Sequence, residues 1–258
     1  MAIHPTAIVD KRAEVDSSAE IGPYAVIGPK VKIGPRTRVG PHAVIEGDTT
    51  LGEGNVVFQF AALGAIPQDL KYAGEATRLV IGNQNQIREF ATVHIGTAGG
   101  GGVTRIGNGC LLMANSHVAH DVQIADGCIL ANSVALAGHV NVEDHVIFGG
   151  LSAVHQFTRI GRLAFISGGA MVTQDVPPYV TVQGDRAEVI GINSVGLTRA
   201  HFDEHALARV KGAYKVVFRS RMGLREAVAH VKAEYGGHAE IDHFVAFLEQ
   251  TEGRGIAR

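Results

Sequence analysis

The centre of the chain carries polar side chains that could move a proton. His117, His120 and Asp121 lie within five residues of one another, and His139 and His155 follow further along. A neutral imidazole held by a carboxylate or a carbonyl group is a suitable general base near pH 7. His120 is the central candidate, because Asp121 or a backbone group could fix its tautomer. The sequence therefore predicts acid–base chemistry, provided that the fold gathers these groups.

Two further segments carry groups that could bind a substrate or a partner. Residues 64–78 contain Asp69 and Lys71, which could bind a hydroxyl and a phosphate respectively. Lys211, Lys215 and Arg219 are spaced four residues apart and form one basic stripe on an expected helix, which favours an acidic partner. A solvated connector and a solvated helix face are the alternative interpretations.

The composition narrows the class of protein. The chain has 258 residues, 33 of them glycine, with 46% hydrophobic and 19% charged residues and a formal net charge of −2. These values exclude a disordered chain and give no basic excess for nucleic-acid binding. No run approaches the ~18 apolar residues of a membrane helix, and the first residues lack the pattern of a signal peptide. We expect a cytoplasmic protein with no membrane span and no nucleic-acid partner.

An internal repeat predicts the fold. Apolar residues, aliphatic in every case but Phe148, recur at every sixth position from Ile3 to Leu63, from Ile81 to Val93 and from Ile106 to Val172. A six-residue step would spread them around a helix, whereas a short strand and a turn fit each hexad. The pattern resembles the hexapeptide-repeat family, which implies three hexads per coil and left-handed winding. We predict a mainly β protein, with a left-handed parallel β-helix over residues 1–189 and loops near 65–78 and 97–102.

A coil of eighteen residues converts sequence position into a place around the prism. Residues eighteen apart, such as His120, Gly138 and Gln156, are expected to lie one above another. A polar turn residue taken singly needs no function, but several histidines aligned with a carboxylate favour a functional corner. The residues expected at or near this corner are His117, His120, Asp121, Gly138, His139, His155 and Gln156.

Clustered histidines also raise the alternative of a zinc site. Zinc requires three side chains aimed at one point, about 2.1 Å from the metal. The best-known metal site on such prisms pairs histidines five residues apart, whereas His117 and His120 are three apart. A nucleophile is poorly supported, because Cys110 and Cys128 occupy inward positions and Ser116 has no glycine elbow. We therefore predict no metal and no covalent intermediate.

A different periodicity begins after the paired prolines of DVPPYV (175–180), which end the prism. Apolar residues then fall at helical spacing in three sets, and Asp203 is a candidate cap for the first. We predict a small α-helical domain over residues 190–258. The three sets are Leu207, Val210, Tyr214 and Val217; Leu224, Val228, Val231 and Tyr235; and Ile241, Phe244 and Leu248.

Several motifs together resemble one enzyme family, the UDP-N-acetylglucosamine O-acyltransferases that begin lipid A synthesis. They are QDLKYAGE (68–75), NSHVAHD (115–121), LAGHV (136–140), AVHQF (153–157) and DVPPYV. The resemblance spans nearly the whole chain. It implies a homotrimer with active sites between neighbouring subunits. It also implies transfer of a 3-hydroxyacyl chain from acyl carrier protein to the glucosamine 3-hydroxyl of UDP-N-acetylglucosamine, with no further cofactor.

The resemblance implies roles for individual residues. His120 matches the general base that deprotonates the acceptor hydroxyl, and Gly138 matches the residue whose N–H stabilises the oxyanion, a role worth about 2.7–4 kcal/mol. The expected catalytic group is therefore His120, Gly138 and Asp121. Gly168 matches the position that limits acyl length, and glycine there favours a longer chain. Expected substrate contacts are Asp69, Lys71, His117, His139, His155, Gln156, Asn193 and Arg199; expected carrier-protein contacts are Lys211, Lys215 and Arg219.

Three tail residues depart from the pattern, and other enzymes stay open as alternatives. Arg186, Val195 and Ala200 stand where some relatives carry histidine, acidic or second arginine residues, which leaves the nucleotide contacts open. The related UDP-sugar N-acyltransferase of the same pathway has an extra domain before its repeats, whereas the hexads here begin at Ile3. A zinc-dependent hydratase on the same scaffold would hold stoichiometric zinc, and a non-catalytic scaffold would not gather polar residues at one corner.

Overall fold

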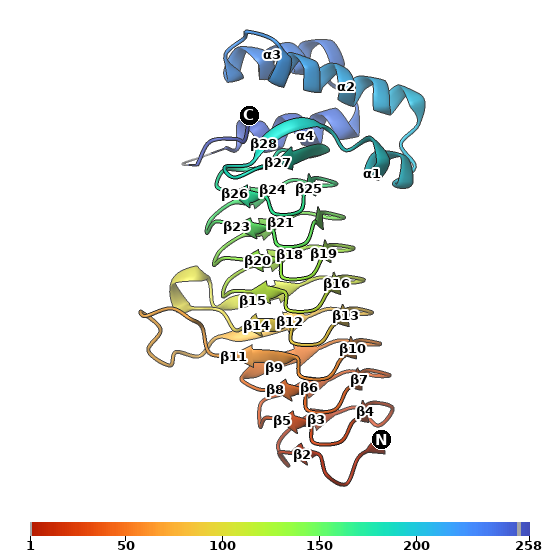
Figure 1. Ribbon diagram of the computed structural model, residues 1–258, viewed down its shortest axis with the longest axis vertical. Coiled ribbons are helices and arrows are strands. Elements are labelled where there is room, and N and C mark those ends of the chain that lie inside the picture. Colours follow the sequence, from red (N-terminus) through yellow and green to blue (C-terminus); the bar gives the residue numbers. More distant parts are fainter. Residues whose placement is uncertain (1, 252–253) are drawn as a thin grey trace.

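A computed structural model describes residues 2–251 and 254–258 and shows a long prism of short strands with helices at its C-terminal end (Figure 1). The prism is a left-handed parallel β-helix with three strands in each coil. Each strand pairs in parallel with the strand one coil away, except that β27 and β28 are antiparallel. The mainly β fold predicted from the hexad repeat is confirmed.

Three sheets form the walls of the prism. The first wall contains β1 (Ala2–Ile3), β4 (Glu20–Ile21), β7 (Arg38–Val39), β10 (Val56–Val57), β13 (Gln86–Ile87), β16 (Leu111–Leu112), β19 (Ile129–Leu130), β22 (Ile147–Phe148), β25 (Phe165–Ile166), β27 (Val180–Gln183) and β28 (Glu188–Ile192). The second wall contains β2 (Ile8–Val9), β5 (Val26–Ile27), β8 (Val44–Ile45), β11 (Ala62–Ala65), β14 (Thr92–His94), β17 (His117–Val118), β20 (Ala135–Leu136), β23 (Ala153–Val154) and β26 (Met171–Val172). The third wall contains β3 (Glu14–Val15), β6 (Lys32–Ile33), β9 (Asp48–Leu51), β12 (Arg78–Ile81), β15 (Val103–Ile106), β18 (Gln123–Ile124), β21 (Asn141–Val142) and β24 (Arg159–Ile160).

The sixth-position aliphatic residues form the core of the prism. Ile27, Leu63 and Leu136, one from each of three coils, are at most 1% exposed. Burial of such a side chain contributes about 1.5–3 kcal/mol, most of which offsets the entropy lost on ordering the chain. Cys110 and Cys128 lie in the same core as free thiols, as their inward positions predicted.

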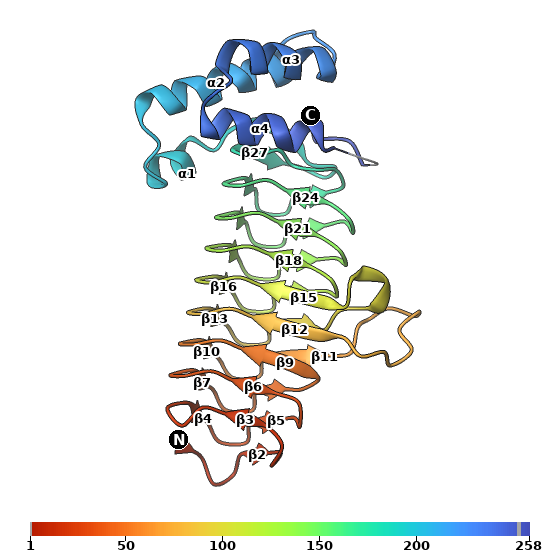
Figure 2. The ribbon, with the colours of Figure 1, turned by 180° about the vertical axis from the view of Figure 1, so that it is seen from behind.

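Two excursions leave the prism at one corner. Coils repeat every eighteen residues, but Asp48 pairs with Arg78 across thirty residues, and Arg78 pairs with Val103 across twenty-five. The extra residues form the long loop (residues 66–77), between β11 and β12, and the glycine strap (residues 96–102), between β14 and β15, which includes the short helix η1 (Ala98–Gly100). Both stand out from the edge between the second and third walls, in orange and yellow (Figure 2).

The C-terminal end is helical. Asp203 caps the second helix, since its Oδ1 accepts a hydrogen bond of 2.7 Å from the N–H of Ala206. Apolar side chains of the helices pack together and against Leu163 and Tyr179 from the last turns of the prism. In the part of the chain that the structure describes, no helix is both long enough and apolar enough to span a membrane. The helices are α1 (Ser194–Arg199), α2 (Glu204–Arg219), α3 (Leu224–Tyr235) and α4 (Ala239–Glu249).

Candidate active site

The corner that carries both excursions also carries the aligned polar residues. The turns after β17, β20 and β23 stack on one another through backbone hydrogen bonds. The N–H of His139 donates to the carbonyl of His120, and that of Phe157 donates to the carbonyl of Gly138, both at 3.1 Å. His120, Gly138 and Gln156 therefore lie one above another, as the eighteen-residue spacing predicted.

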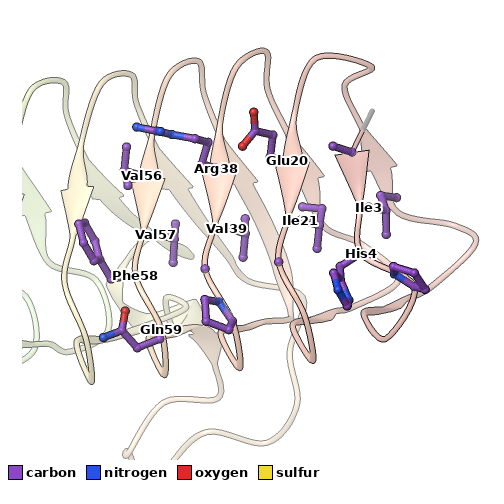
Figure 3. Close-up of a pocket in the computed structure, with 15 residues that line it drawn as sticks. Ile3, His4, Glu20, Ile21, Arg38, Val39, Val56, Val57, Phe58 and Gln59 are labelled. Atoms are coloured by element: carbon purple, nitrogen blue, oxygen red, sulfur yellow. The ribbon is translucent and has the colours of Figure 1, made fainter.

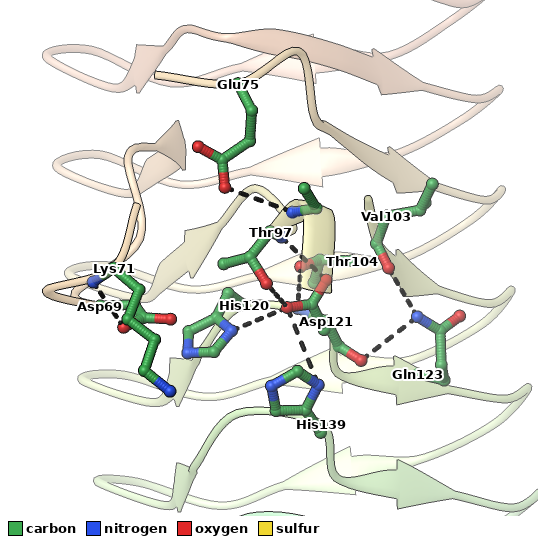
Figure 4. A network of polar contacts seen from close by, with 11 residues as sticks. Asp69, Lys71, Glu75, Thr97, Val103, Thr104, His120, Asp121, Gln123 and His139 are labelled. Atoms are coloured by element: carbon green, nitrogen blue, oxygen red, sulfur yellow. Dashed lines mark hydrogen bonds and ion pairs between the residues drawn. The ribbon is translucent and has the colours of Figure 1, made fainter. Parts of the chain in front are cut away.

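His120 and Asp121 form a hydrogen-bonded pair. Nδ1 of His120 lies 2.8 Å from Oδ2 of Asp121, a contact marked by a dashed line in Figure 4. The imidazole is 13% exposed, and the carboxylate has no exposed surface. When Nδ1 carries the proton that the carboxylate accepts, Nε2 is left with a free lone pair. This arrangement prepares Nε2 to accept a proton from a bound substrate.

Two threonines that the sequence reasoning did not single out hold Asp121. Thr97, on the glycine strap, donates its backbone N–H to Oδ1 at 2.8 Å and its hydroxyl to Oδ2 at 2.6 Å. Thr104, on β15, accepts the N–H of Asp121 at 2.8 Å. The sequence signal for the first contact is the break in the repeat at TAGGGG (97–102), which predicts a loop but not the group that the loop contacts.

Gly138 lies directly against the His120 ring. A Cβ atom at this position would lie 2.6 Å from Cε1 and 2.8 Å from Nε2 of His120, which is shorter than van der Waals contact. Among the described residues, the backbone N–H of Gly138 donates to no acceptor. Glycine therefore lets the imidazole approach the turn and leaves an unused donor beside Nε2.

His139 completes the corner as a neutral ring. It stacks on Phe157, with ring centroids 4.3 Å apart, and meets the His120 ring edge-on at 5.1 Å. Its Nδ1 lies 3.8 Å from Oδ2 of Asp121. Burial lowers the pKa of His139, although the nearby carboxylates of Asp121 and Asp69 oppose this shift. At pH 7 the ring can donate and accept hydrogen bonds without carrying a charge.

A second histidine pair lies beside the corner on the second wall. Nδ1 of His117 is 2.7 Å from the hydroxyl of Thr92, and the ring of His94 meets that of His117 edge-on at 4.9 Å. Burial is the main cause that lowers the pKa of both rings, and that of His94 falls to about 4. His94 is 6% exposed, and its buried Nδ1 has no hydrogen-bond partner among the described residues. The sequence reasoning did not identify His94.

His155 and Gln156 lie at the same corner but are exposed. Nδ1 of His155 approaches the carbonyl oxygen of Gln156 at 3.2 Å. No ring contact or ion pair joins His155 to His120 or His139 within residues 2–251 and 254–258. The structure thus brings two of the three aligned imidazoles into contact, and the third faces solvent one coil away.

The long loop carries its polar residues to the corner. Asp69 and Lys71 lie beside His120 in Figure 4, and the N–H of Lys71 donates to Oδ1 of Asp69 at 3.0 Å. Glu75 of the same loop accepts the N–H of Ala98 at 3.3 Å, which ties the loop to the glycine strap. The long loop and the glycine strap therefore form one side of the candidate site.

The remaining predicted site residues lie elsewhere in the same chain. Asn193 and Arg199 line a cavity of about 360 Å³ on the outer face of the first wall, together with Val195. Asn193 also caps α1 by accepting the N–H of Gly196 at 3.0 Å, and it donates to the carbonyl of Leu163 at 2.9 Å. In a three-sided prism the first wall lies opposite the corner that holds the histidines.

Gly168 and the other two departing tail residues are also separate from His120. Gly168 follows β25 at the corner between the first and second walls, and a Cβ there would meet only the backbone of Gly150. Arg186 lies exposed between β27 and β28, and Ala200 ends α1. None of these positions adjoins the histidine corner in the topology of one chain.

The basic stripe is only partly free to meet a partner. Lys211 and Lys215 are exposed along α2. Arg219 folds back instead, donating to the hydroxyl of Tyr214 at 2.9 Å and to the carbonyl of Ile190 at 3.2 Å. Arg219 keeps its charge, because both of these acceptors are neutral, but its guanidinium is held against Tyr214 and β28, whereas Lys211 and Lys215 lie along the exposed side of α2.

A separate hollow lies at the N-terminal end of the prism (Figure 3). It encloses about 740 Å³ on the outer face of the first wall, where Glu20, Arg38 and Phe58 line it. None of the predicted site residues is among the residues that line it. Size alone therefore does not locate the chemistry in this molecule.

The corner also holds three groups of the kind that bind metals. Ligand atoms of His120, Asp121 and His139 lie within 4.8 Å of one another in the described residues. Both oxygens of Asp121, however, already accept hydrogen bonds from Thr97, and Oδ2 accepts one from His120 as well. The donor set is thus arranged to orient an imidazole, which favours general-base chemistry.

Comparisons with known proteins agree with this arrangement. Residues 175–257 match the family described as Udp N-acetylglucosamine O-acyltransferase, Domain 2, and residues 12–47 and 104–138 match the bacterial transferase hexapeptide repeats. The acyl-[acyl-carrier-protein]–UDP-N-acetylglucosamine O-acyltransferase of an Anaeromyxobacter species is 63% identical over 258 residues, which is 100% of both chains. The protein of that name from Myxococcus xanthus is 59% identical over 256 residues, 99% of each chain.

Solved structures show the same similarity. The crystal structure of UDP-N-acetylglucosamine O-acyltransferase from Moraxella catarrhalis has a TM-score of 0.97, with 41% identity and complete coverage of both chains. The Francisella novicida UDP-N-acetylglucosamine acyltransferase has a TM-score of 0.94 at 38% identity, covering 99% of this chain and 94% of that one. Because identity this high extends over the whole length, the chain belongs to the family of acyl-[acyl-carrier-protein]–UDP-N-acetylglucosamine O-acyltransferases.

Proposed function

We propose that this chain transfers an acyl group from acyl carrier protein to UDP-N-acetylglucosamine, the reaction that begins lipid A synthesis. The names of its relatives and their identity over the full chain support this function. The observation that carries it is the pairing of a buried, carboxylate-oriented imidazole with an unused backbone donor, His120 with Gly138. The N-acyltransferase and the zinc hydratase are not favoured, since these relatives are named O-acyltransferases.

The chemistry follows from the position of these groups. Nε2 of His120 accepts the proton of the glucosamine 3-hydroxyl. At the same time the oxygen of that hydroxyl attacks the thioester carbonyl of a 3-hydroxyacyl chain. The N–H of Gly138 donates to the oxyanion of the tetrahedral intermediate. When the C–S bond breaks, the phosphopantetheine thiolate takes the proton back from His120. Asp121 stabilises the imidazolium throughout, and no covalent enzyme intermediate forms.

Surrounding residues are proposed to bind the substrates. Lys71 offers a positive charge for a phosphate, and Asp69 offers a hydrogen-bond acceptor for a sugar hydroxyl, both beside His120. The neutral ring of His139 and the exposed His155 and Gln156 extend this surface along the corner. His117 is proposed to contact the same substrate from the second wall. No metal or cofactor is part of the proposed reaction.

The division of the site residues supports a homotrimer. Asn193, Arg199 and Gly168 lie away from the His120 corner, so one chain does not bring all the proposed contacts together. In the proposed trimer, the His120 corner of one subunit would face the first wall of the next, so that two chains complete each site. The acyl carrier protein is proposed to bind near Lys211 and Lys215, with Arg219 at the edge of that surface. The buried thiols of Cys110 and Cys128 suit a reducing cytoplasm.

The function is tested with purified protein and defined substrates. Carrier-linked 3-hydroxyacyl donors of different lengths are incubated with UDP-N-acetylglucosamine, and mass spectrometry identifies the products. We expect an O-acylated product, made best from a longer donor because Gly168 leaves its corner open. His120→Ala is expected to lose at least about 10²-fold in kcat, the contribution of a general base. His145→Ala is the matched control, because His145 is exposed and far from this corner.

Three outcomes contradict the proposal. Near-normal turnover by His120→Ala shows that His120 is not the general base. Acylation of a UDP-glucosamine whose amine is free, with no product from UDP-N-acetylglucosamine, assigns the chain to the related N-acyltransferases. Stoichiometric zinc, whose removal abolishes activity, favours the hydratase.

A further inference from the structure

We propose that Thr97 is a positioning residue for this reaction, because the glycine strap holds Asp121 in the orientation in which it fixes His120. The inference deepens the proposed function and rests on it for the identity of the base. The strap is residues 96–102, and it lies over the buried carboxylate at the corner between the second and third walls.

The hydrogen bonds of Thr97 fix the positions of both carboxylate oxygens of Asp121. Its backbone N–H donates to Oδ1 at 2.8 Å, and its hydroxyl donates to Oδ2 at 2.6 Å. Oδ2 is also the atom that forms the hydrogen bond of 2.8 Å with Nδ1 of His120. The hydroxyl of Thr97 is thus two hydrogen bonds away from Nε2, the atom that takes the substrate proton.

The glycines of the strap bring it close enough to make these bonds. A Cβ at Gly100 would lie 2.0 Å from Cγ of Asp121 and 2.2 Å from its Oδ2. A Cβ at Gly96 would lie 2.8 Å from Oδ1. Any side chain at Gly100 therefore requires the strap to lift from the carboxylate. This close approach explains Gly96 and Gly100, whereas Gly101 and Gly102 adopt positive φ values of +90° and +79°, which favour glycine.

Loss of the Thr97 hydroxyl has a predictable electrostatic effect. Without this donor, Oδ2 keeps more negative charge and attracts the protonated imidazole more strongly. The imidazole is also held less firmly, so fewer complexes have Nε2 in line with the acceptor hydroxyl. The other ionisable groups around the pair are His94, His117 and His139 on the prism and Asp69, Lys71 and Glu75 on the long loop, and Thr97→Val alters none of these side chains directly.

The test compares three threonine variants. Thr97→Val keeps the shape of the side chain and the backbone donor but removes the hydroxyl. Thr97→Ser restores a hydroxyl. Thr77→Val is the matched control, because the buried hydroxyl of Thr77 has no hydrogen-bond partner among the described residues, and its methyl group lies 3.9 Å from where a Cβ of Gly102 would be.

We expect Thr97→Val to lower kcat about 10-fold, the effect of losing one hydrogen bond to a charged group, with KM for both substrates unchanged. The acid limb of its pH–rate profile is expected to move to higher pH. Thr97→Ser and Thr77→Val are expected to keep the wild-type profile. If Thr97→Val fails to fold, Gly100→Ala replaces it; because this variant lifts the strap and removes both hydrogen bonds of Thr97, it is expected to lower kcat at least as much.

A readout without substrate separates this inference from the proposed function. The His120 imidazole is titrated by ¹⁵N NMR in the free protein, where Thr97→Val is expected to move its midpoint to higher pH. An unchanged midpoint together with an unchanged acid limb overturns the inference. A shifted midpoint in a protein that makes no acylated product supports the role of Thr97 and contradicts the proposed reaction instead.

Discussion

His120 and Asp121 are neighbours in the sequence, and their side chains nevertheless face each other. In an extended strand, consecutive side chains point to opposite faces. Asp121 instead occupies a left-handed turn position with φ of +61°, which interrupts this alternation. Its carboxylate thereby reaches Nδ1 of His120 at 2.8 Å. The turn geometry of the coil is therefore part of the orientation of the proposed base.

At the same scale, His94 is expected to make stability depend on pH. Burial, together with the charges of His117 and His120, lowers its pKa from 6.5 to about 4. Below pH 6.5 the unfolded chain therefore binds a proton that the folded chain does not bind. The contribution of His94 to the free energy of unfolding is therefore fully present above pH 6.5. It falls towards pH 4, by at most about 1.4 kcal/mol per pH unit.

Removing this ring checks the effect. In His94→Gln we expect the free energy of unfolding to fall less between pH 7 and pH 5 than in the wild type, with a difference of about 1–2 kcal/mol. Urea denaturation at both pH values and at one fixed protein concentration measures it. An equal fall in both proteins contradicts the assignment of this titration to His94.

At the scale of elements, Arg159 of β24 joins the helices to the prism. Its Nε lies 2.8 Å from Oδ2 of Asp175, and its guanidinium stacks 4.3 Å above the ring of Phe247 in α4. Its Nη2 also donates to the carbonyl of Phe247 at 3.1 Å and to the hydroxyl of Thr251 at 3.0 Å. One side chain thus connects the third wall to the C-terminal end of α4.

Arg159→Ala is expected to destabilise the protein by about 3–5 kcal/mol, because it leaves the carboxylate of Asp175 buried without its cation. Arg12→Ala is the control. The pair that Arg12 forms with Asp10 lies at the surface, where solvent screens it, so its loss is expected to change the free energy of unfolding far less. Chemical denaturation of both variants measures the difference. Equal effects of the two substitutions contradict the role given to Arg159.

Elements that follow the repeat were predictable, and those that break it were not. The six-residue step identified the strands, the inward residues and the stacking of His120 on Gly138, because every coil repeats the same pattern of burial. The glycine strap has no period, so its position was predictable but the contacts of Thr97 with Asp121 were not. Likewise, no local pattern showed that Asn193 caps α1 while it lines a cavity.

At the scale of the whole molecule, the proposed site is divided between two faces of the prism. The corner with His120 lies between the second and third walls, whereas Arg199 lines a cavity on the first wall. If each site combines these faces from two subunits, two inactive variants can complement each other. Subunits with His120→Ala still supply Arg199, and subunits with Arg199→Ala still supply His120.

Coexpression of these two variants is expected to restore activity. Random assembly into a closed ring gives each site an intact His120 and an intact Arg199 with a probability of about one quarter. We therefore expect about a quarter of the wild-type specific activity from the mixture and far less from either variant alone. Steady-state assays of the three preparations measure this. A mixture no more active than its components places the whole site within one chain.

The two excursions add twelve and seven residues at one corner, and the coils on either side still pair in register. The prism therefore tolerates changes in the length of a corner without any displacement of its walls. New peptides grafted at the same corner between β5 and β6, two coils before the long loop, should leave both the scaffold and the turns that hold His120 and Gly138 intact. The architecture separates the part that must be rigid from the part that can be redesigned.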